Sequence, residues 1–171
     1  MTGFLCATCG QTHDSIPLCL GAAVPELWHT IPEAERADRV DLTSDQCVID
    51  GRHFFILGRI LLPVIDGEDS FVWLVWVSLS ETNFVRSGEL WESEGREAEP
   101  PYFGWLQTSL PGYSTDTLNL KTSVQTMPVG QRPLVTLEPT DHPLAVEQRV
   151  GITMARVQQI AEAALHGLPA V

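Results

Sequence analysis

Two cysteines near the start of the chain have the type and spacing of metal ligands. Cys6 and Cys9 stand three residues apart in the stretch FLCATCGQTHD, a glycine follows the second cysteine directly, and His13 comes four residues later. A Cys-x-x-Cys-Gly sequence forms a tight turn in which both thiolates can face one ion, and the glycine supplies the unusual backbone angle. The stretch therefore predicts half of a structural zinc site.

Zinc needs four soft or borderline ligands, so two more residues must complete the set. His13 lies in the same loop as the two cysteines, and Cys47 stands at the start of an expected strand. We predict that the metal ligands are Cys6, Cys9, His13 and Cys47. The main substitute for the third or fourth ligand is Cys19, and His29 and His53 are further candidates.

Two other interpretations of the opening stretch stay open. A thioredoxin-like redox pair would use the same two cysteines, but it requires a strand-to-helix junction within a βαβ unit, and no such pattern surrounds Cys6. In the second interpretation, the cysteines are reduced and bind no ligand. Metal binding explains the glycine and the nearby histidine best.

A second group of ionisable residues stands in the stretch TDHPLAVEQ, which contains Asp141, His142 and Glu147. A carboxylate and an imidazole at the head of a helix could act as an acid–base pair or bind a metal ion, as in a metal-dependent hydrolase. Helix capping by Thr140 or Asp141 explains the stretch more simply, because adjacent side chains do not readily face each other on a helix. The hydrolase is therefore the alternative function.

Aromatic residues bracket the most acidic part of the chain. Trp91, Tyr102, Phe103 and Trp105 flank or follow a segment with five glutamates between residues 89 and 99. Aromatic anchors with a polar rim are typical of protein-recognition surfaces. We predict these four residues as an interaction surface, and packing against the core is the competing explanation.

The charge of the chain is negative and unevenly distributed. The net charge is −12, and residues 1–100 carry 17 acidic residues and 6 arginines, whereas residues 101–171 carry 5 acidic and 4 basic residues. Such a surface repels phosphate backbones, so we predict no nucleic-acid partner. The longest apolar runs, at 60–65 and 71–77, are far shorter than the ~20 residues of a membrane helix. With no signal peptide at its start either, the chain is expected to be cytoplasmic, with reduced cysteines and no membrane partner.

The elements that must position these residues begin with two short helices in residues 25–39, where Pro25 and Pro32 suit first turns. From residue 45 the pattern becomes that of strands. QCVID and RHFFILGRILLPVI flank Asp50-Gly51, a strong signal for a two-residue hairpin loop. SFVWLVWVSLS is apolar on both faces and predicts a central strand covered on both sides. Residues 81–101 are expected to be irregular.

Two more strands and two helices are expected in the last third of the chain. TLNLKTSVQT alternates as a half-buried strand and RPLVTLEP is a shorter one. TDHPLAVEQRVG and TMARVQQIAEAALHG have the caps and apolar stripes of helices. We predict a single α+β domain over residues 1–171, with a central antiparallel sheet on which short N-terminal helices and C-terminal helices pack. Residues 1–20 would form a zinc-ribbon-like, metal-binding loop within it.

Five separated segments resemble one bacterial family, which is catalogued only as domain of unknown function 2199. They are CATCGQTHD, DQCVIDGRHFFILGRI, FVWLVWVSLSETNF, YFGWLQTSLPGY and TDHPLAVEQRVGI, and the resemblance runs from Phe4 to about His166. It implies a single-domain bacterial cytoplasmic protein without an established activity. The family pattern does not include Cys19 and gives joint weight to Cys6, Cys9, Gly10, His13 and Cys47.

These observations favour a non-enzymatic protein-binding module whose N-terminal loop is stabilised by zinc and whose acidic-aromatic surface contacts another protein. One specific form is an immunity or regulatory protein that occupies the basic active site of a toxin, because opposite charge speeds association. The sequence is compatible with a monomer or a homodimer.

Overall fold

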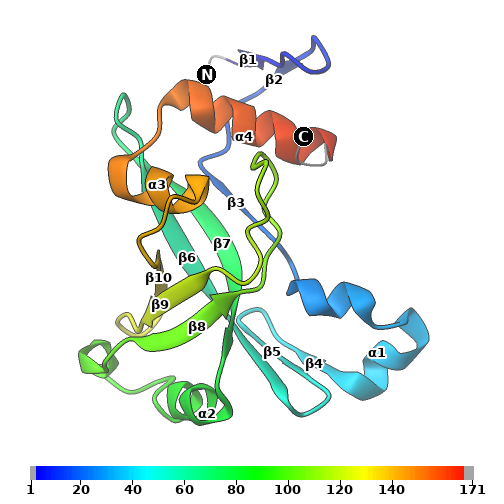
Figure 1. The fold of residues 1–171 in the computed structure, drawn as a ribbon, viewed down its shortest axis with the longest axis vertical. Helices are drawn as coiled ribbons and strands as arrows, with labels where there is room; N and C mark the ends of the chain where they lie inside the picture. Colours follow the sequence, from blue (N-terminus) through cyan, green and yellow to red (C-terminus); the bar gives the residue numbers. More distant parts are fainter. Residues whose placement is uncertain (1–2, 168–171) are drawn as a thin grey trace.

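A computed structural model of the chain describes residues 3–167, which form a mixed α+β fold (Figure 1). The strands are β1 Phe4–Leu5, β2 Thr12–His13, β3 Cys19–Gly21, β4 Val40–Leu42, β5 Gln46–Ile49, β6 His53–Pro63, β7 Ser70–Leu79, β8 Tyr102–Leu106, β9 Lys121–Gln125 and β10 Leu134–Leu137. The α-helices are α1 Glu33–Arg39, α2 Glu81–Glu89, α3 Pro143–Val150 and α4 Met154–His166, and the short 3₁₀ helices are η1 Glu26–Thr30 and η2 Arg96–Ala98.

The main sheet closes into a barrel of five strands. Around the ring, β7 pairs with β8, β8 with β9, β9 with β10, β10 with β6, and β6 again with β7. The prediction of a central antiparallel sheet therefore needs correction in two respects. The sheet is closed, and its closing pair, β10 with β6, is parallel. Outside the ring, β3 adds to β7 in parallel, while β5 and β4 extend the sheet from β6.

Gly58 lets the ring close. A Cβ atom at this position would lie 2.5 Å from Cγ2 of Val135 on β10 and 3.2 Å from the carbonyl oxygen of Pro133. The same carbonyl oxygen accepts a hydrogen bond from the backbone N–H of Arg59 at 2.9 Å. The sequence predicts a bulge or bend at Gly58, and in the structure the missing side chain makes room for β10.

The hairpin of β5 and β6 confirms the turn signal of Asp50-Gly51. Both residues have positive φ angles, 54° and 61°, as the signal requires. The loop is one residue longer than expected, because Ile49 pairs with His53 and three residues connect them.

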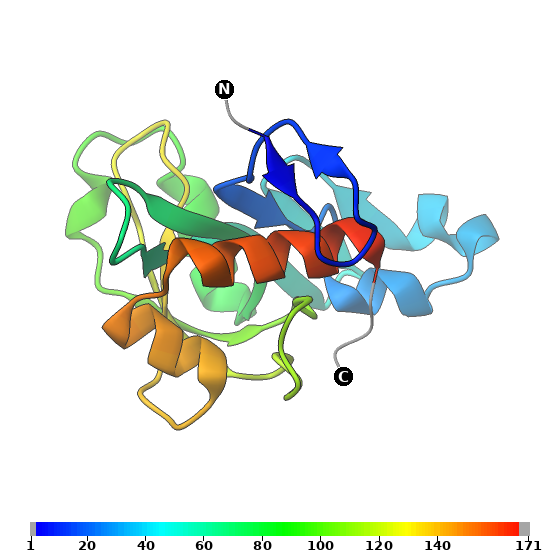
Figure 2. The same cartoon turned by 90° about the horizontal axis from the view of Figure 1, so that it is seen from above.

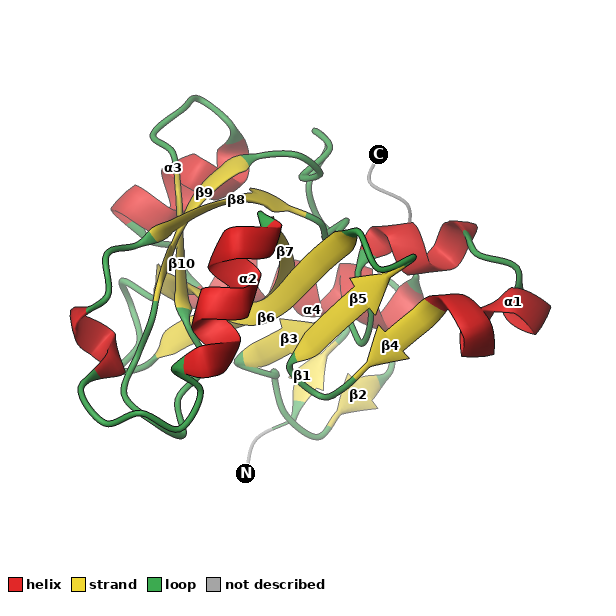
Figure 3. Cartoon of the chain, turned by 90° about the horizontal axis from the view of Figure 1, so that it is seen from below, coloured by secondary structure: helices red, strands yellow, loops and turns green. Residues whose placement is uncertain are grey.

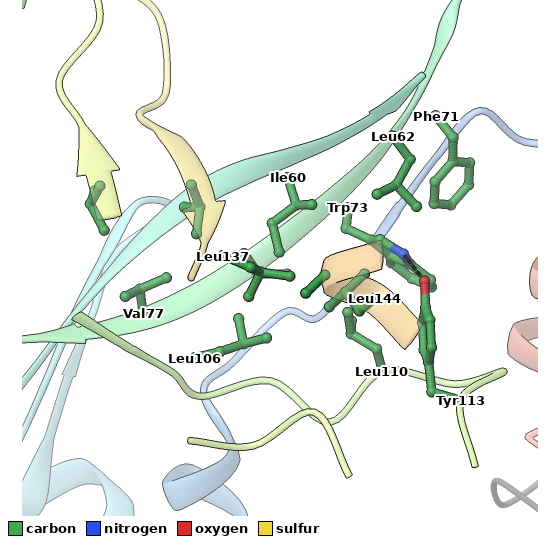
Figure 4. Packing of buried hydrophobic residues seen from close by; sticks show 14 of the residues in the cluster. Ile60, Leu62, Phe71, Trp73, Val77, Leu106, Leu110, Tyr113, Leu137 and Leu144 are labelled. Carbon is green, nitrogen blue, oxygen red and sulfur yellow. Dashed lines mark hydrogen bonds between the residues drawn. The ribbon is translucent and has the colours of Figure 1, made fainter. Parts of the chain in front are cut away.

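β7 carries the core on both of its faces, as its doubly apolar sequence predicts. Trp73, Val75 and Val77 belong to the barrel core together with residues of the other ring strands and of α3 and α4. Figure 4 shows Trp73 and Val77 beside Leu106, Leu137 and Leu144. On the opposite face, Trp76 belongs to a smaller cluster outside the ring, which we call the outer cluster. Its buried members are Ile31, Cys47, Ile49, Phe55, Leu57 and Trp76.

The N-terminal helical stretch confirms the expected pair of short helices. η1 follows Pro25 and α1 follows Pro32, so each proline stands immediately before a helix. Leu27 and Trp28 of η1 pack against the outer cluster.

Residues 81–101, expected to be irregular, begin with a helix. Ser80 caps α2 by accepting a hydrogen bond from the backbone N–H of Asn83 at 3.2 Å. Phe84 of this helix packs against Phe54 with 5.2 Å between ring centroids, so α2 covers part of the barrel beside β6 (Figure 3).

The two C-terminal helices are confirmed, with one change of cap. His142, rather than Thr140 or Asp141, is the N-cap of α3, and Thr153 is the N-cap of α4 as expected. Val157, Ile160 and Ala161 bury the inner face of α4 against the barrel core. Across residues 3–167, the structure contains no helix that is both long enough and apolar enough to cross a membrane.

Candidate metal centre

The two N-terminal cysteines lie in the turn of the β1–β2 hairpin. The backbone N–H of Cys6 donates to the carbonyl oxygen of Gln11 at 2.9 Å, and the N–H of Gly10 donates to the carbonyl oxygen of Cys6 at 2.9 Å. Gly10 has a φ of +69°, a conformation that other residues rarely adopt, so the glycine after the second cysteine is required by the turn. The backbone thus presents both thiols on the same side.

Four side chains from opposite ends of the chain meet at this hairpin. The ligand atoms of Cys6, Cys9, His13 and His166 all lie within 4.8 Å of one another. The Sγ of Cys6 is 3.1 Å from Nε2 of His166, and the Sγ of Cys9 is 3.5 Å from Nε2 of His13. Figure 2 shows the hairpin lying across the C-terminal part of α4, which carries His166.

The environment of Cys6 favours its thiolate. Burial alone raises the pKa of this thiol, but hydrogen bonds from the backbone of Cys9, from His166 and from the backbone of Thr8 together lower the pKa to about 6. Thiolate is the form of cysteine that binds metal ions. Phe4 stacks on His13 with 5.2 Å between ring centroids, which holds that imidazole beside the thiols.

One face of α4 holds the hairpin in place. Gln158, Glu162 and His166 are spaced by four residues, so they line one side of the helix. The amide of Gln158 donates to the carbonyl oxygen of Leu5 at 3.0 Å, and the carboxylate of Glu162 accepts from the backbone N–H of Ala7 at 2.9 Å. Hydrogen bonds from Gln158 and from Ala7 lower the pKa of Glu162, so the carboxylate stays ionised beside the cluster.

The chain matches a family model described as an uncharacterised protein conserved in bacteria, DUF2199, over residues 5–152. It belongs to that family. No curated protein and no solved structure matches it significantly. The matched DUF2199 region spans the positions of Cys6, Cys9 and His13 and ends before His166, so three of the four clustered residues lie within it.

Cys47, the fourth ligand that the sequence predicts for this DUF2199 chain, does not join the other three in the structure. Cys47 is a member of the outer cluster, where burial raises the pKa of its thiol to about 11. The fourth member of the group that the structure brings together is His166. The thiol of Cys19 lies exposed on β3, and neither His29 nor His53 is part of the group of four.

The sequence did not indicate His166 as a ligand. It stands at the end of α4, and the apolar stripe of that segment is already explained by a helix packed on the core. One signal was available: Glu162 and His166 are separated by four residues and therefore share a helix face. That pairing is common on solvated helices, and nothing local relates it to a turn 160 residues away.

The four predicted surface aromatics fall into two pairs. Phe103 and Trp105 alternate with buried residues on β8, are 51% and 40% exposed, and touch edge to face with 5.1 Å between ring centroids. Tyr102 is buried in the barrel core, and half-buried Trp91 packs against that core. Of the four, Phe103 and Trp105 are the exposed residues.

Two residues of the alternative hydrolase site, His142 and Glu147, have structural partners. The Nδ1 atom of His142 accepts from the backbone N–H of Leu144 at 3.1 Å. Glu147 accepts hydrogen bonds from the hydroxyl of Tyr113 at 2.6 Å and from Nε of Arg156 at 2.7 Å. Among residues 3–167, neither Asp141, His142 nor Glu147 belongs to a group that could hold a metal ion.

Proposed function

We propose that Cys6, Cys9, His13 and His166 bind one structural zinc ion, and that the protein is a zinc-stabilised, non-enzymatic protein-binding module. The zinc site is supported by one observation: two thiols and two imidazoles from opposite ends of the chain lie together. Zinc sites with two cysteines and two histidines are closed, tetrahedral and structural.

The distances in the cluster suit such an ion. With Zn–S bonds of ~2.3 Å and Zn–N bonds of ~2.0 Å, neighbouring ligand atoms of a tetrahedron lie about 3.3–3.8 Å apart. The S–N distances of 3.1 and 3.5 Å are close to that range, so small side-chain movements would complete the site. Two soft thiolates with two imidazoles favour zinc over magnesium or calcium, which prefer oxygen ligands.

A closed site supports a structural rather than a catalytic role. Catalytic zinc sites have three protein ligands and leave a fourth position for water or substrate. Here four protein side chains would fill the coordination sphere. Glu147, the general base that a hydrolase would need, is held by Tyr113 and Arg156 instead.

Protein binding is supported by the exposed pair Phe103 and Trp105. Hollows flank the pair, one of about 480 Å³ that Phe103 lines with Leu137, and one of about 580 Å³ that Trp105 lines with Phe54. Aromatic anchors beside hollows are common at the centre of protein interfaces. The net charge of −12 favours a basic partner, as expected for an immunity or regulatory protein in the cytoplasm.

Elemental analysis tests the zinc site. We expect about one zinc per chain in untagged protein, and X-ray absorption should report two sulfur and two nitrogen ligands. Cys9→Ser should lose the ion, whereas Cys19→Ser and Cys47→Ser should keep it. Cys19 is the matched control because both it and Cys9 are exposed. Wild-type protein that binds no zinc after reduction and reconstitution would refute the site.

A comparison of two proteins tests the surface. Wild-type protein and the double variant Phe103→Ser, Trp105→Ser are immobilised and exposed to lysate at low salt. We expect a basic protein to be retained by the wild type and lost from the variant, with unchanged thermal stability of the variant. Equal retention by both proteins would reject this face as the binding surface.

A further inference from the structure

One hollow of the structure has none of the clustered cysteine and histidine residues in its lining and is rich in arginine. It has a volume of about 630 Å³, and its walls include Arg59 from β6, Arg96 from η2 and Arg132 from the loop before β10. The other charged residues in its lining are Asp45 and Glu92, so the lining carries a net charge of +1. A positive hollow is unexpected in a chain with a net charge of −12.

Two of the three arginines are occupied by the protein itself. Arg96 is buried, and it donates hydrogen bonds to the carbonyl oxygens of Trp91, Met127, Pro128 and Gln131. It therefore fixes the loop that forms one wall and contributes charge to the hollow. Arg132 donates from Nε to the carboxylate of Asp45 at 2.6 Å.

Arg59 has no such partner. Its Nε is the one buried side-chain nitrogen or oxygen atom in residues 3–167 that lacks a hydrogen bond, and the guanidinium forms no ion pair within those residues. A buried donor without an acceptor is costly, and such an exception calls for an explanation. The terminal nitrogens of Arg59 are not among these buried atoms and have no hydrogen-bond partner in residues 3–167 either, so an acceptor that enters the hollow from solution would meet the guanidinium at these two atoms.

We propose that this hollow binds a small organic oxyanion, whose carboxylate or phosphate group is held by the guanidinium of Arg59. The planar fork of an arginine matches the oxygen atoms of both groups. Half-buried Trp91 supplies an apolar wall, and the volume is in the range of small-molecule sites. The ligand is therefore larger than a simple ion, with a flat or apolar body against the indole.

The site is independent of the proposed zinc and of the Phe103–Trp105 face. Its lining contains none of the four clustered cysteine and histidine residues and neither of the two exposed aromatics. Failure of either proposal leaves the other unaffected.

Titration with phenyl phosphate, benzoate and inorganic phosphate, followed by the Nε–H signal of Arg59 in ¹H–¹⁵N spectra, tests the proposal. We expect saturable binding of at least one aromatic anion, with weaker binding of inorganic phosphate. Comparison of phenyl phosphate with benzoate distinguishes a phosphate from a carboxylate ligand. A linear, unsaturated response to all three probes would overturn the proposal.

Three variants separate specific binding from general attraction by charge. Arg59→Gln should weaken binding by about tenfold or more, because a charge-assisted hydrogen bond is lost. Glu92→Gln should strengthen binding, since it removes an exposed carboxylate from the lining. Arg52→Gln, an exposed arginine outside the hollow, is the matched control and should leave binding unchanged.

Equal affinity in Arg59→Gln, Arg52→Gln and wild type would reject Arg59 as the anchor. The dispersion of the spectra shows whether each variant is folded. If Arg59→Gln does not fold, two other results test the anchor. A saturable shift of the Arg59 signal in wild type and stronger binding in Glu92→Gln would support it, and the absence of both would reject it.

Discussion

The Sγ atom of Cys6 lies 3.1 Å from the Nε2 atom of His166, although 160 residues separate them in sequence. This contact joins the N-terminal hairpin to the last turn of α4. The hairpin itself has two strands of two residues each, which is too little to be stable in water. Its conformation therefore depends on the helix and on the ion that we propose between them.

His166→Ala should release the zinc or weaken its binding strongly, because a structural site that loses one of four ligands is open to water and chelators. We expect a lower melting temperature and faster transfer of zinc to a chromogenic chelator. His29→Ala is the control, since His29 is exposed on η1. Similar zinc release from the two variants would show that His166 is not a ligand.

Glu162→Ala should weaken zinc binding although Glu162 is not a ligand. The carboxylate accepts the backbone N–H of Ala7, which lies between the two cysteines, so its loss frees the turn. Partners of this kind typically change metal affinity by about 10–100-fold. Competition with a chelator of known affinity measures the effect, and Glu162→Gln, which keeps one acceptor oxygen, should fall between. Unchanged affinity in Glu162→Ala would contradict this role.

The sequence predicts the local part of this centre and misses the distant part. Cys6, Cys9 and His13 lie within eight residues, and their spacing alone indicates a shared turn. The fourth member depends on where α4 docks, which is decided by packing of Val157 and Ile160 on the barrel core. Cys47 is misleading because a buried cysteine in a strand behaves as a small apolar residue.

Gly58→Ala should destabilise the barrel at its closing pair. The added methyl group would meet Cγ2 of Val135 at 2.5 Å, and overpacking of this kind typically costs about 1–3 kcal/mol. Gly88→Ala is the matched control, because a Cβ there meets nothing within 4 Å and alanine favours α2. Urea unfolding of both variants measures the difference. A Gly58→Ala protein as stable as Gly88→Ala would show that β10 can move aside.

Strands β5, β6 and β7 were predictable because their signals are local. The Asp50-Gly51 turn specifies the first hairpin, and the apolar run of β7 identifies the central strand. Closure of the ring was not predictable in the same way. Leu134 pairs with Arg59 across 75 residues, and no periodicity reports which strand edge a short segment will join.

Glu99→Gln should make the stability of the protein less sensitive to acid. Hydrogen bonds from Arg86, at 2.8 and 3.1 Å, lower the pKa of Glu99, and the hydroxyl of Tyr102 adds a further bond. Because the pKa of Glu99 is lower in the folded protein than in the unfolded chain, its bonds to Arg86 and Tyr102 stabilise the fold at every pH above the ordinary carboxyl pKa. This stabilisation is lost as the pH falls from there through the lower folded value.

The free energy of unfolding, measured by urea titration from pH 6 down to pH 3, should therefore fall less steeply in Glu99→Gln than in wild type. Glu94→Gln, a change in the same acidic segment at an exposed residue, is the control. Parallel curves for Glu99→Gln and wild type would show that the Arg86–Glu99 pair does not contribute.

The order of the elements in the sequence also determines when each part of the fold can form during synthesis. β6 and β7 can pair as soon as both have left the ribosome, but the ring stays open until β10 follows, and α4 comes later still. Cys6 and Cys9 therefore emerge long before the helix that carries His166. In a growing chain they are two accessible thiols, open to oxidants and to any soft metal ion, until His166 has been made.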